Sequence, residues 1–336
     1  MGTQVGFIDT CHESSAPGPA RAFLSILSYF VREVFCSPMR LLRVATRIAA
    51  NLSIQFRVFQ LLKIGVFTRF VCAHPQFLFK YLSPRYLLRD IPVTTRTACF
   101  LHHYLYLHAA MPQNLLRRVL AGNVTLFTLC KDGHHFEIAF GRSREVPGTR
   151  HVEHEGEMSI HLLVDNVHAY VLSFTVVPGW VCGVEAADVL MITRVQGSLG
   201  VFPSISLASR TMHGIPPEML LLTALQGVSL ALGVSVMAGV SAVRHLCYDQ
   251  ADDIIFRKGY DDFFDRVGAV RNAAGFYLAR FPLPEKPLAL VKSGQKTRSR
   301  ARRTLKQEVA SSAFELLRGP LAIPTMPTAA GAPSEQ

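Results

Sequence analysis

The sequence lacks the patterns that identify most enzymes from sequence. It has no Gly-x-Ser-x-Gly elbow, no Walker phosphate-binding loop and no dinucleotide fingerprint, and no Ser, His and Asp stand at the spacing of a catalytic triad. Hydrolase, kinase and dehydrogenase functions are therefore disfavoured. The chain also has no Cys-x-x-Cys pair, and its 7 cysteines are scattered singly. Such unclustered thiols are typical of a reduced protein without a disulfide framework, which predicts a cytoplasmic location.

Acidic residues are the scarcer charged class. Lys and Arg number 35 against 24 Asp and Glu, which leaves a formal charge of +11. This excess favours acidic partners such as anionic lipid head groups, nucleic acid or phosphorylated cofactors, and does not select among them.

One uncharged run, 219–243, is long enough to cross a bilayer. However, Pro216 and Pro217 suit the first turn of a helix, and Gly233 suits the position just after a helix end. The sequence therefore predicts a buried helix followed by a buried strand, and no transmembrane span.

The segment 21–121 is predicted to be a basic helical region. Apolar residues recur there at helical spacing with arginines between them, and three to five helices are expected, separated near Pro38, Pro75, Pro84 and Pro92. Two interpretations stay open for its basic faces. They are either solvated faces of a helical bundle or a docking surface for an anionic membrane, which would place the protein peripherally at the inner membrane.

The segment 122–290 changes to short strands separated by turn-rich segments. An antiparallel meander is expected, followed by a helix, a strand, a second helix and a last strand. The predicted strands are 124–129, 136–140, 158–164, 169–176, 189–196, 234–241 and 276–281, and the predicted helices are 216–232 and 250–267. The fold class is therefore α+β, with a helical N-terminal part followed by a mostly antiparallel sheet domain.

This element order resembles the acyl-CoA N-acyltransferase (GNAT-like) fold. In that fold the strand before the central helix and the N-terminus of this helix bind the pyrophosphate of the cofactor. The resemblance implies acyl-CoA or acyl-carrier protein as the donor.

The segment 291–318 is predicted to be a basic tail helix. Its Lys and Arg residues would bind polyanions, and because no aromatic residue interleaves them, base stacking is not supported and nucleic acid is the less favoured partner. The flanking segments 1–20 and 319–336 are predicted to be disordered.

The segment 151–157, His-Val-Glu-His-Glu-Gly-Glu, looks like a cluster of metal ligands. Signals of this kind depend on a helix that places both imidazoles on one face, and Gly156 before an alternating strand argues against a helix. No metal site is predicted.

In a strand, Glu155 and Glu157 would share one face with Ser159 and His161. That face is either simply solvated or lines a cleft in which a carboxylate acts as general base. Arg194 and Gln196 share a face of a later strand and could bind a carboxylate, amide or phosphate. A structural ion pair between Arg194 and one of the two glutamates explains the same residues.

Three further residues are candidates. His213 precedes a helix N-terminus, whose dipole would keep the imidazole neutral and able to act as a base. Tyr260 and Asp261 follow Gly259, either as site residues or as an ordinary turn and helix cap.

Several short motifs occur in one order along the chain: His102-His103-Tyr104, Glu155-Gly156-Glu157, Gln196-Gly197, a loop from Thr211 to Pro217, Val240-Ser241 and Tyr260-Asp261. This order resembles the VirK/YbjX family, whose biochemical function is unknown and whose members are associated with virulence and resistance to cationic antimicrobial peptides. With the residues above, the resemblance implies a set of candidate site residues. Those expected to be catalytic are Glu155, Glu157 and His213, and those expected to bind substrate or cofactor are Arg194, Gln196, Gly197, Thr211, Ser241, Tyr260 and Asp261.

Two functional hypotheses follow, and whether the protein is an enzyme stays open between them. The first is a cytoplasmic, envelope-associated bacterial protein of the VirK/YbjX type with an acyl-transfer cleft. The second is a non-enzymatic protein that binds anionic lipid or nucleic acid through its basic helices and tail.

Overall fold

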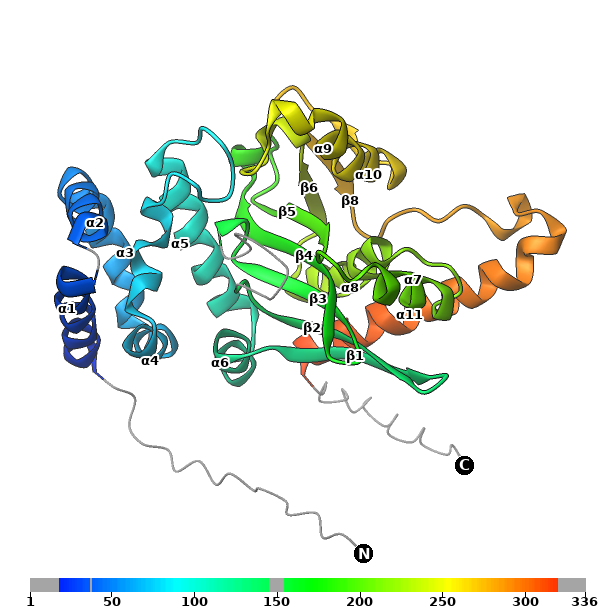
Figure 1. The fold of residues 1–336 in the computed structure, drawn as a ribbon, viewed down its shortest axis with the longest axis horizontal. Helices are drawn as coiled ribbons and strands as arrows, with labels where there is room; N and C mark the ends of the chain where they lie inside the picture. Colours follow the sequence, from blue (N-terminus) through cyan, green and yellow to red (C-terminus); the bar gives the residue numbers. More distant parts are fainter. Residues whose placement is uncertain (1–17, 37, 145–153, 320–336) are drawn as a thin grey trace, which may run out of the picture.

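The computed structural model describes residues 18–36, 38–144 and 154–319. The N-terminal helices lie to one side of a single sheet, and two long helices of the second half, α8 and α11, pack against it (Figure 1). The sheet domain and the N-terminal helices together bury one continuous apolar core.

Helices fill most of the chain before the first strand, and the helix bounds follow the prolines. The elements are α1 (Pro19–Cys36), α2 (Pro38–Ala50), α3 (Leu52–Phe59), α4 (Gly65–Ala73), α5 (Val93–Ala110) and α6 (Gln113–Ala121), with 3₁₀ turns at Gln60–Lys63 and Pro75–Leu82. The described part of 18–121 thus holds six α-helices where three to five were predicted. The expected breaks at Pro38, Pro75 and Pro92 are present, and a further one falls at Asn51, whose backbone (φ −135, ψ 36) leaves the helical region.

The eight strands form one sheet in the order β1-β2-β3-β4-β5-β6-β8-β7. They are β1 (Val124–Lys131), β2 (His134–Arg142), β3 (Met158–Val164), β4 (Val167–Pro178), β5 (Asp188–Gly197), β6 (Val236–Val240), β7 (Val270–Arg271) and β8 (Phe276–Arg280). The first five strands form the predicted antiparallel meander. Asp165 and Asn166 both have positive φ (50 and 65), as the tight β3–β4 hairpin turn requires.

The strands β5 and β6 are parallel, unlike every other neighbouring pair of the sheet. Their pairing covers only three positions, Leu190–Met237 to Ile192–Gly239. β5 continues to Gly197, whereas β6 ends at Val240. The last residues of β5 therefore have no β6 partner, and the segment that follows β6 lies beside them instead.

Four α-helices lie between β5 and β7: α7 (Phe202–Thr211), α8 (Pro217–Leu232), α9 (Asp253–Gly259) and α10 (Asp261–Arg266). The uncharged run 219–243 forms most of α8 and all of β6, as predicted, and Gly233 ends α8 in the left-handed conformation (φ 83). α8 packs on β3, β4 and β5. No helix of the described residues is long and apolar enough to span a membrane.

The basic tail is the helix α11 (Lys296–Arg318), which packs along α8 and against β1. Several of its cations are used within the fold: Arg298 and Arg302 donate to the carbonyl of His213 at 2.9 Å, and Arg303 pairs with Glu285 at 3.2 Å. The tail is therefore part of the sheet domain rather than a free arm.

The predicted fold class holds at the level of a mixed α+β protein, with N-terminal helices followed by an eight-stranded, mostly antiparallel sheet. The predicted boundaries between domains stay predictions. The predicted disorder of 1–20 and 319–336 falls almost wholly outside the described residues, as does 151–153 of the histidine-rich segment.

Candidate functional site

A buried ion pair joins Glu155 to Arg194 of β5. Their exposed fractions are 1% and 2%, and Nη1 of Arg194 donates to Oε2 of Glu155. Nη2 of Arg194 donates to Oε1 of Gln196 at 2.8 Å, so Arg194 and Gln196 share one face as predicted. The hydroxyl of Thr193 donates to the backbone carbonyl of Glu155, which fixes the glutamate against β5. The ion-pair alternative for Arg194 is thus what the structure contains.

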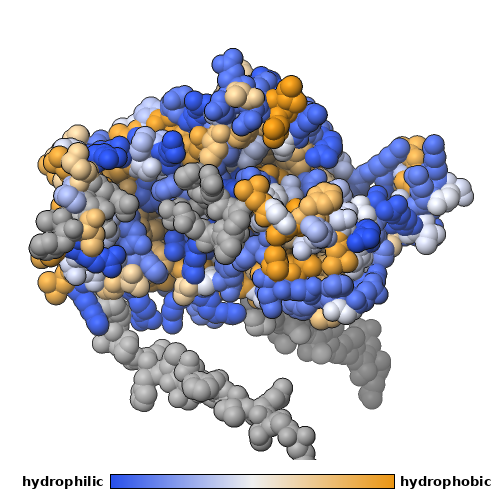
Figure 2. All heavy atoms as spheres, viewed as in Figure 1, coloured by the Kyte–Doolittle hydropathy of each residue, from blue (hydrophilic) through white to orange (hydrophobic). Residues whose placement is uncertain are grey.

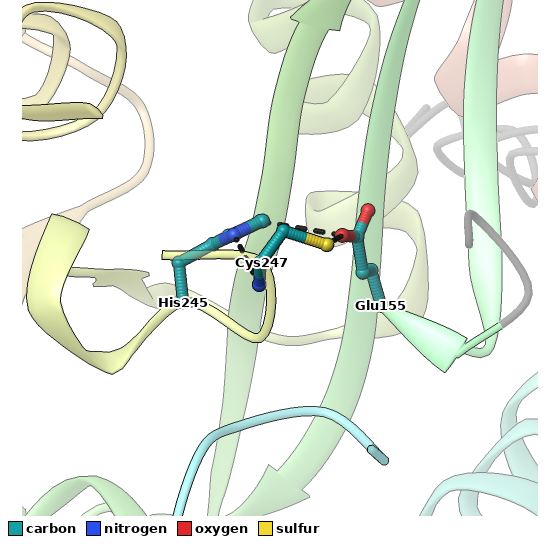
Figure 3. Close-up of side chains that lie close together, drawn as sticks. All are labelled: Glu155, His245 and Cys247. Atoms are coloured by element: carbon teal, nitrogen blue, oxygen red, sulfur yellow. Dashed lines mark hydrogen bonds and ion pairs between the residues drawn. The ribbon is translucent and has the colours of Figure 1, made fainter. Parts of the chain in front are cut away.

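Two more side chains reach Glu155 from the segment after β6, and a third contacts one of these two. The Cys247 thiol donates to Oε1 of Glu155 at 3.1 Å, and Nε2 of His245 lies 3.6 Å from the same oxygen (Figure 3). The Tyr260 hydroxyl lies 2.8 Å from Nε2 of His245. We call Glu155, Arg194, His245, Cys247 and Tyr260 the Glu155 cluster. It lies beside the end of β5 that extends past β6.

The neutral members of the Glu155 cluster owe their charge state to burial. Burial, with repulsion from the Arg194 guanidinium, lowers the pKa of His245 to about 3. Partial burial and the neighbouring Glu155 carboxylate raise the pKa of the Cys247 thiol to about 12, and full burial raises the pKa of Tyr260 well above its usual value. Near neutral pH the cluster therefore contains a neutral imidazole, a protonated thiol and a protonated phenol around one ion pair.

Glu157 belongs to a different network. It is fully buried, and its carboxylate accepts from the hydroxyls of Tyr86, at 2.5 Å, and Tyr104, and pairs with Nζ of Lys80 at 3.0 Å. Glu155 and Glu157 both precede β3, which begins at Met158, so the prediction that they share one strand face is wrong.

The reason for this separation is Gly156. A Cβ at this position would lie 2.9 Å from Cβ of Ser173 and 3.0 Å from the backbone nitrogen of Phe174. The chain therefore passes close to β4 between the two glutamates, and each carboxylate has its own cation. The mutual repulsion expected of a carboxylate pair does not arise, and a catalytic role for either glutamate stays a prediction.

Thr211 at the end of α7 and His213 in the loop before α8 make other contacts. His213 has φ 56, and its carbonyl accepts from Arg298 and Arg302 of α11. The Thr211 carbonyl accepts from Nζ of Lys131 at 3.4 Å. Among the described contacts, none joins His213 to the Glu155 cluster. Its predicted role as a base therefore has no geometric support from the cluster.

Gly197 and Asp261 stand next to site residues in the sequence but have structural roles of their own. A Cβ at Gly197 would lie 2.9 Å from Cδ1 of Ile205, so this glycine admits α7. Oδ1 of Asp261 accepts from the backbone N–H of Ala242 at 2.9 Å, which fixes the turn after β6. Ser241 is fully buried, and its hydroxyl has no partner among the described residues.

Sequence reasoning missed His245 and Cys247. The only local signal is their His-x-Cys spacing shortly after the Val240-Ser241 strand end. Cys247 stands 92 residues after Glu155 in the chain, so no local pattern joins the two.

The structure thus defines a mixed α+β protein with a polar cluster beside the point where β5 extends past the end of its parallel neighbour β6. The family described as "Protein of unknown function (DUF535)" matches residues 39–313. The match covers most of the chain, which therefore belongs to this family, the same one as the VirK/YbjX family of the sequence resemblance. Neither the curated proteins nor the solved structures contain a significant match.

Proposed function

We propose that this protein docks on anionic membrane surfaces through α1, α2 and α3. The observation that carries the proposal is a concentration of exposed apolar side chains on these three helices. Eight large apolar residues there are at least half exposed: Phe23, Leu24, Leu27, Val31, Met39, Leu42, Leu52 and Phe56. At the left of Figure 2, where these helices lie, apolar and hydrophilic residues stand side by side on the surface.

The exposed apolar residues follow the helical repeat. Leu24, Leu27 and Val31 are three and four residues apart on α1, and Leu52 and Phe56 are four apart on α3. Residues at these spacings lie on one side of a helix. Isolated exposed leucines are ordinary, but aligned ones with basic neighbours are typical of helices that lie in the plane of a bilayer interface.

The positive charge of this region favours an anionic bilayer over an apolar partner that carries no negative charge. From residue 34 to residue 89 the sequence contains nine Lys and Arg and no Asp or Glu. Arg43, Arg57 and Lys63 are exposed. Each such cation near an anionic lipid surface contributes about 1 kcal/mol to binding. The inner face of a bacterial cytoplasmic membrane is the location that this proposal implies.

The experiment is flotation of the full chain with vesicles of phosphatidylcholine, with and without phosphatidylglycerol. We expect binding to the anionic vesicles, lost in a triple variant Leu24→Ser, Leu27→Ser, Phe56→Ser. The matched control changes three residues exposed elsewhere, Leu199, Phe202 and Ile254, to Ser. Equal binding of the two triple variants would reject the proposal.

A second pair of variants separates the charge contribution. Arg43→Glu with Arg57→Glu should weaken binding to anionic vesicles, whereas Arg210→Glu with Arg280→Glu, also exposed, should not. Equal losses in the two would mean that net charge alone, and not these helices, drives the binding.

Acyl transfer is the second candidate, and the sheet supports it. An antiparallel meander followed by helices and a parallel strand resembles the element order of acyl-CoA N-acyltransferases. The Glu155 cluster lies where β5 extends past the end of β6. A groove of about 1040 Å³ lies between α8, α11 and the segment 282–295, and Met219, Leu222, Lys292 and Arg302 are among the residues that line it. Apolar and basic side chains together suit an acyl chain with a phosphorylated carrier. A role of this protein in virulence, which the family resemblance implies, is part of this second proposal.

Calorimetric titration tests this candidate with acyl-CoA and acyl-carrier protein as the two donors. We expect one of them to bind, and we expect Lys292→Glu to weaken it by about tenfold or more through lost phosphate pairing. Lys258→Glu, at another exposed lysine, serves as the control. The absence of binding heat with both donors would reject acyl transfer.

A further inference from the structure

Three side chains of the types that bind zinc converge in the Glu155 cluster. Glu155 comes from the turn before β3, and His245 and Cys247 come from the turn after β6. One ligand atom from each lies within 4.8 Å of the other two. Figure 3 shows the three side chains pointing toward one another from these two turns.

The separations of the ligand atoms suit a tetrahedral ion. Sγ of Cys247 and Nε2 of His245 lie 3.1 and 3.6 Å from Oε1 of Glu155. A tetrahedral zinc with bonds of about 2.0–2.3 Å separates its ligand atoms by about 3.3–3.5 Å. These two distances lie within a few tenths of an ångström of that range, and all three ligand atoms lie within 4.8 Å of one another.

The outer contacts support the same arrangement. Arg194 holds Oε2 of Glu155, and this leaves Oε1 facing His245 and Cys247. Carboxylates that bind metals are usually hydrogen-bonded in this way through their other oxygen. Cys247 is exposed and so gives an ion a path from solvent.

We propose that Glu155, His245 and Cys247 bind one divalent transition-metal ion of the zinc type. The O, N and S ligand set suits zinc, and hard ions such as magnesium and calcium prefer oxygen alone. Three protein ligands leave a fourth position for a water molecule, and the Tyr260 hydroxyl lies beside the His245 ligand. This site goes beyond membrane docking and does not depend on it.

Binding has a defined proton balance. The Cys247 thiol releases its proton to solvent and binds as the thiolate, and no group is oxidised or reduced. In the metal-free chain the Cys247 backbone N–H donates to Nδ1 of His245 at 3.2 Å, so the neutral ring holds its proton on Nε2. Binding through Nε2 moves that proton to Nδ1 and breaks this hydrogen bond.

The test is titration of the full, metal-stripped chain with Co²⁺, followed by competition with Zn²⁺. We expect one equivalent to give the near-ultraviolet thiolate-to-cobalt absorption, which Zn²⁺ abolishes. Cys247→Ser should remove this band and weaken binding by about 100-fold, while Cys36→Ser, at another exposed cysteine, should change neither.

Cobalt could also bind adventitiously at a surface hollow beside the β1–β2 hairpin. Cys130, His134 and Asp165 line this hollow. If His134→Ala abolishes the cobalt signal and Cys247→Ser does not, the proposal is wrong. No thiolate band in the wild-type chain would overturn it as well.

Nuclear magnetic resonance gives an independent readout that does not depend on activity. Zinc should shift the ring nitrogens of His245 and the amide of Cys247 in the wild-type chain, because the tautomer changes. Tyr260→Phe should fold, keep this shift and weaken binding by about 10-fold, as outer-shell variants do. A spectrum unchanged by zinc at both positions would contradict the site.

Discussion

At the residue scale, Arg194 determines whether the buried charge of Glu155 is tolerated. Both side chains are almost completely buried, and removing one partner of such a pair leaves an unpaired charge in a medium of low dielectric constant. We expect Arg194→Met to lower the free energy of unfolding by about 3–5 kcal/mol in urea denaturation at neutral pH. Gln196→Ala, which keeps the ion pair, is the control. A loss as small as that of the control would show that the pair contributes little to the fold.

His161 provides the second residue-scale prediction. It is buried between Ser159, whose hydroxyl lies 2.7 Å from Nε2, and the ring of His168. Burial, with repulsion from His168 and Arg194, lowers its pKa to about 3. The unfolded chain binds a proton below about pH 6.5, so stability is complete above that pH and falls by about 1.4 kcal/mol per pH unit toward pH 3.

We therefore expect His161→Gln to reduce the loss of stability between pH 7.5 and pH 5 by about 2 kcal/mol in urea denaturation. His134→Gln, at a half-exposed histidine of the β1–β2 hairpin, should leave that loss unchanged. If both variants show the acid sensitivity of the wild type, His161 is not the group that takes up the proton.

Sequence reasoning at this scale succeeded where an interaction had few chemical alternatives. An ion pair of Arg194 with Glu155 or Glu157 was one of the two interpretations offered for this arginine, and Arg194 pairs with Glu155. It failed where partners come from distant segments. The tyrosines that surround Glu157 stand 53 and 71 residues before it, and neither carries a local signal of this contact.

At the scale of elements, the contact of α8 with α11 depends on Gly227. A Cβ at this position would lie 2.1 Å from the carbonyl oxygen of Ala310 and 3.0 Å from Cβ of Ala313. We expect Gly227→Ala to push the helices apart and to destabilise the fold by about 1–3 kcal/mol, measured by thermal unfolding. Gly122→Ala, where a Cβ meets nothing within 4 Å, is the control. Equal melting temperatures would mean that the helices adjust without strain.

The elements themselves were largely predictable, because alternating strands and turn residues are local signals. The five strands of the meander and the helix within 219–243 lie where the pattern placed them. The short pairing of β5 with β6 was not predictable. It depends on the turn after β6 and on Asp261, whose carboxylate fixes that turn across 19 residues.

At the scale of the whole molecule, charge and apolar surface on the N-terminal helices act together on a membrane. The Debye length falls from about 10 Å at 0.1 M salt to about 3 Å at 1 M, which screens the cations but not the apolar contacts. We expect vesicle binding to weaken over this range without disappearing, as measured by flotation. If binding does not depend on salt, the exposed apolar residues of these helices alone hold the protein on the vesicle. If salt releases the protein completely, charge alone does so.

The excess of positive charge was evident from composition, but its placement was not. The tail was predicted to be a basic helix that binds polyanions, and three of its cations, Arg298, Arg302 and Arg303, bond within the fold. Periodicity predicted helices in this region, but the spacing of apolar residues cannot distinguish a core from an interface.

The position of α11 in the chain has a consequence for synthesis on the ribosome. This helix packs on β1, and the hydroxyl of Ser312 donates to the carbonyl of Leu126 at 2.6 Å, across 186 residues. All eight strands leave the ribosome before α11 does, so a nascent sheet keeps an uncovered edge at β1 throughout that interval. An open strand edge invites pairing with other chains. The growing polypeptide is therefore most prone to aggregate, and most dependent on chaperones, just before its last described helix emerges.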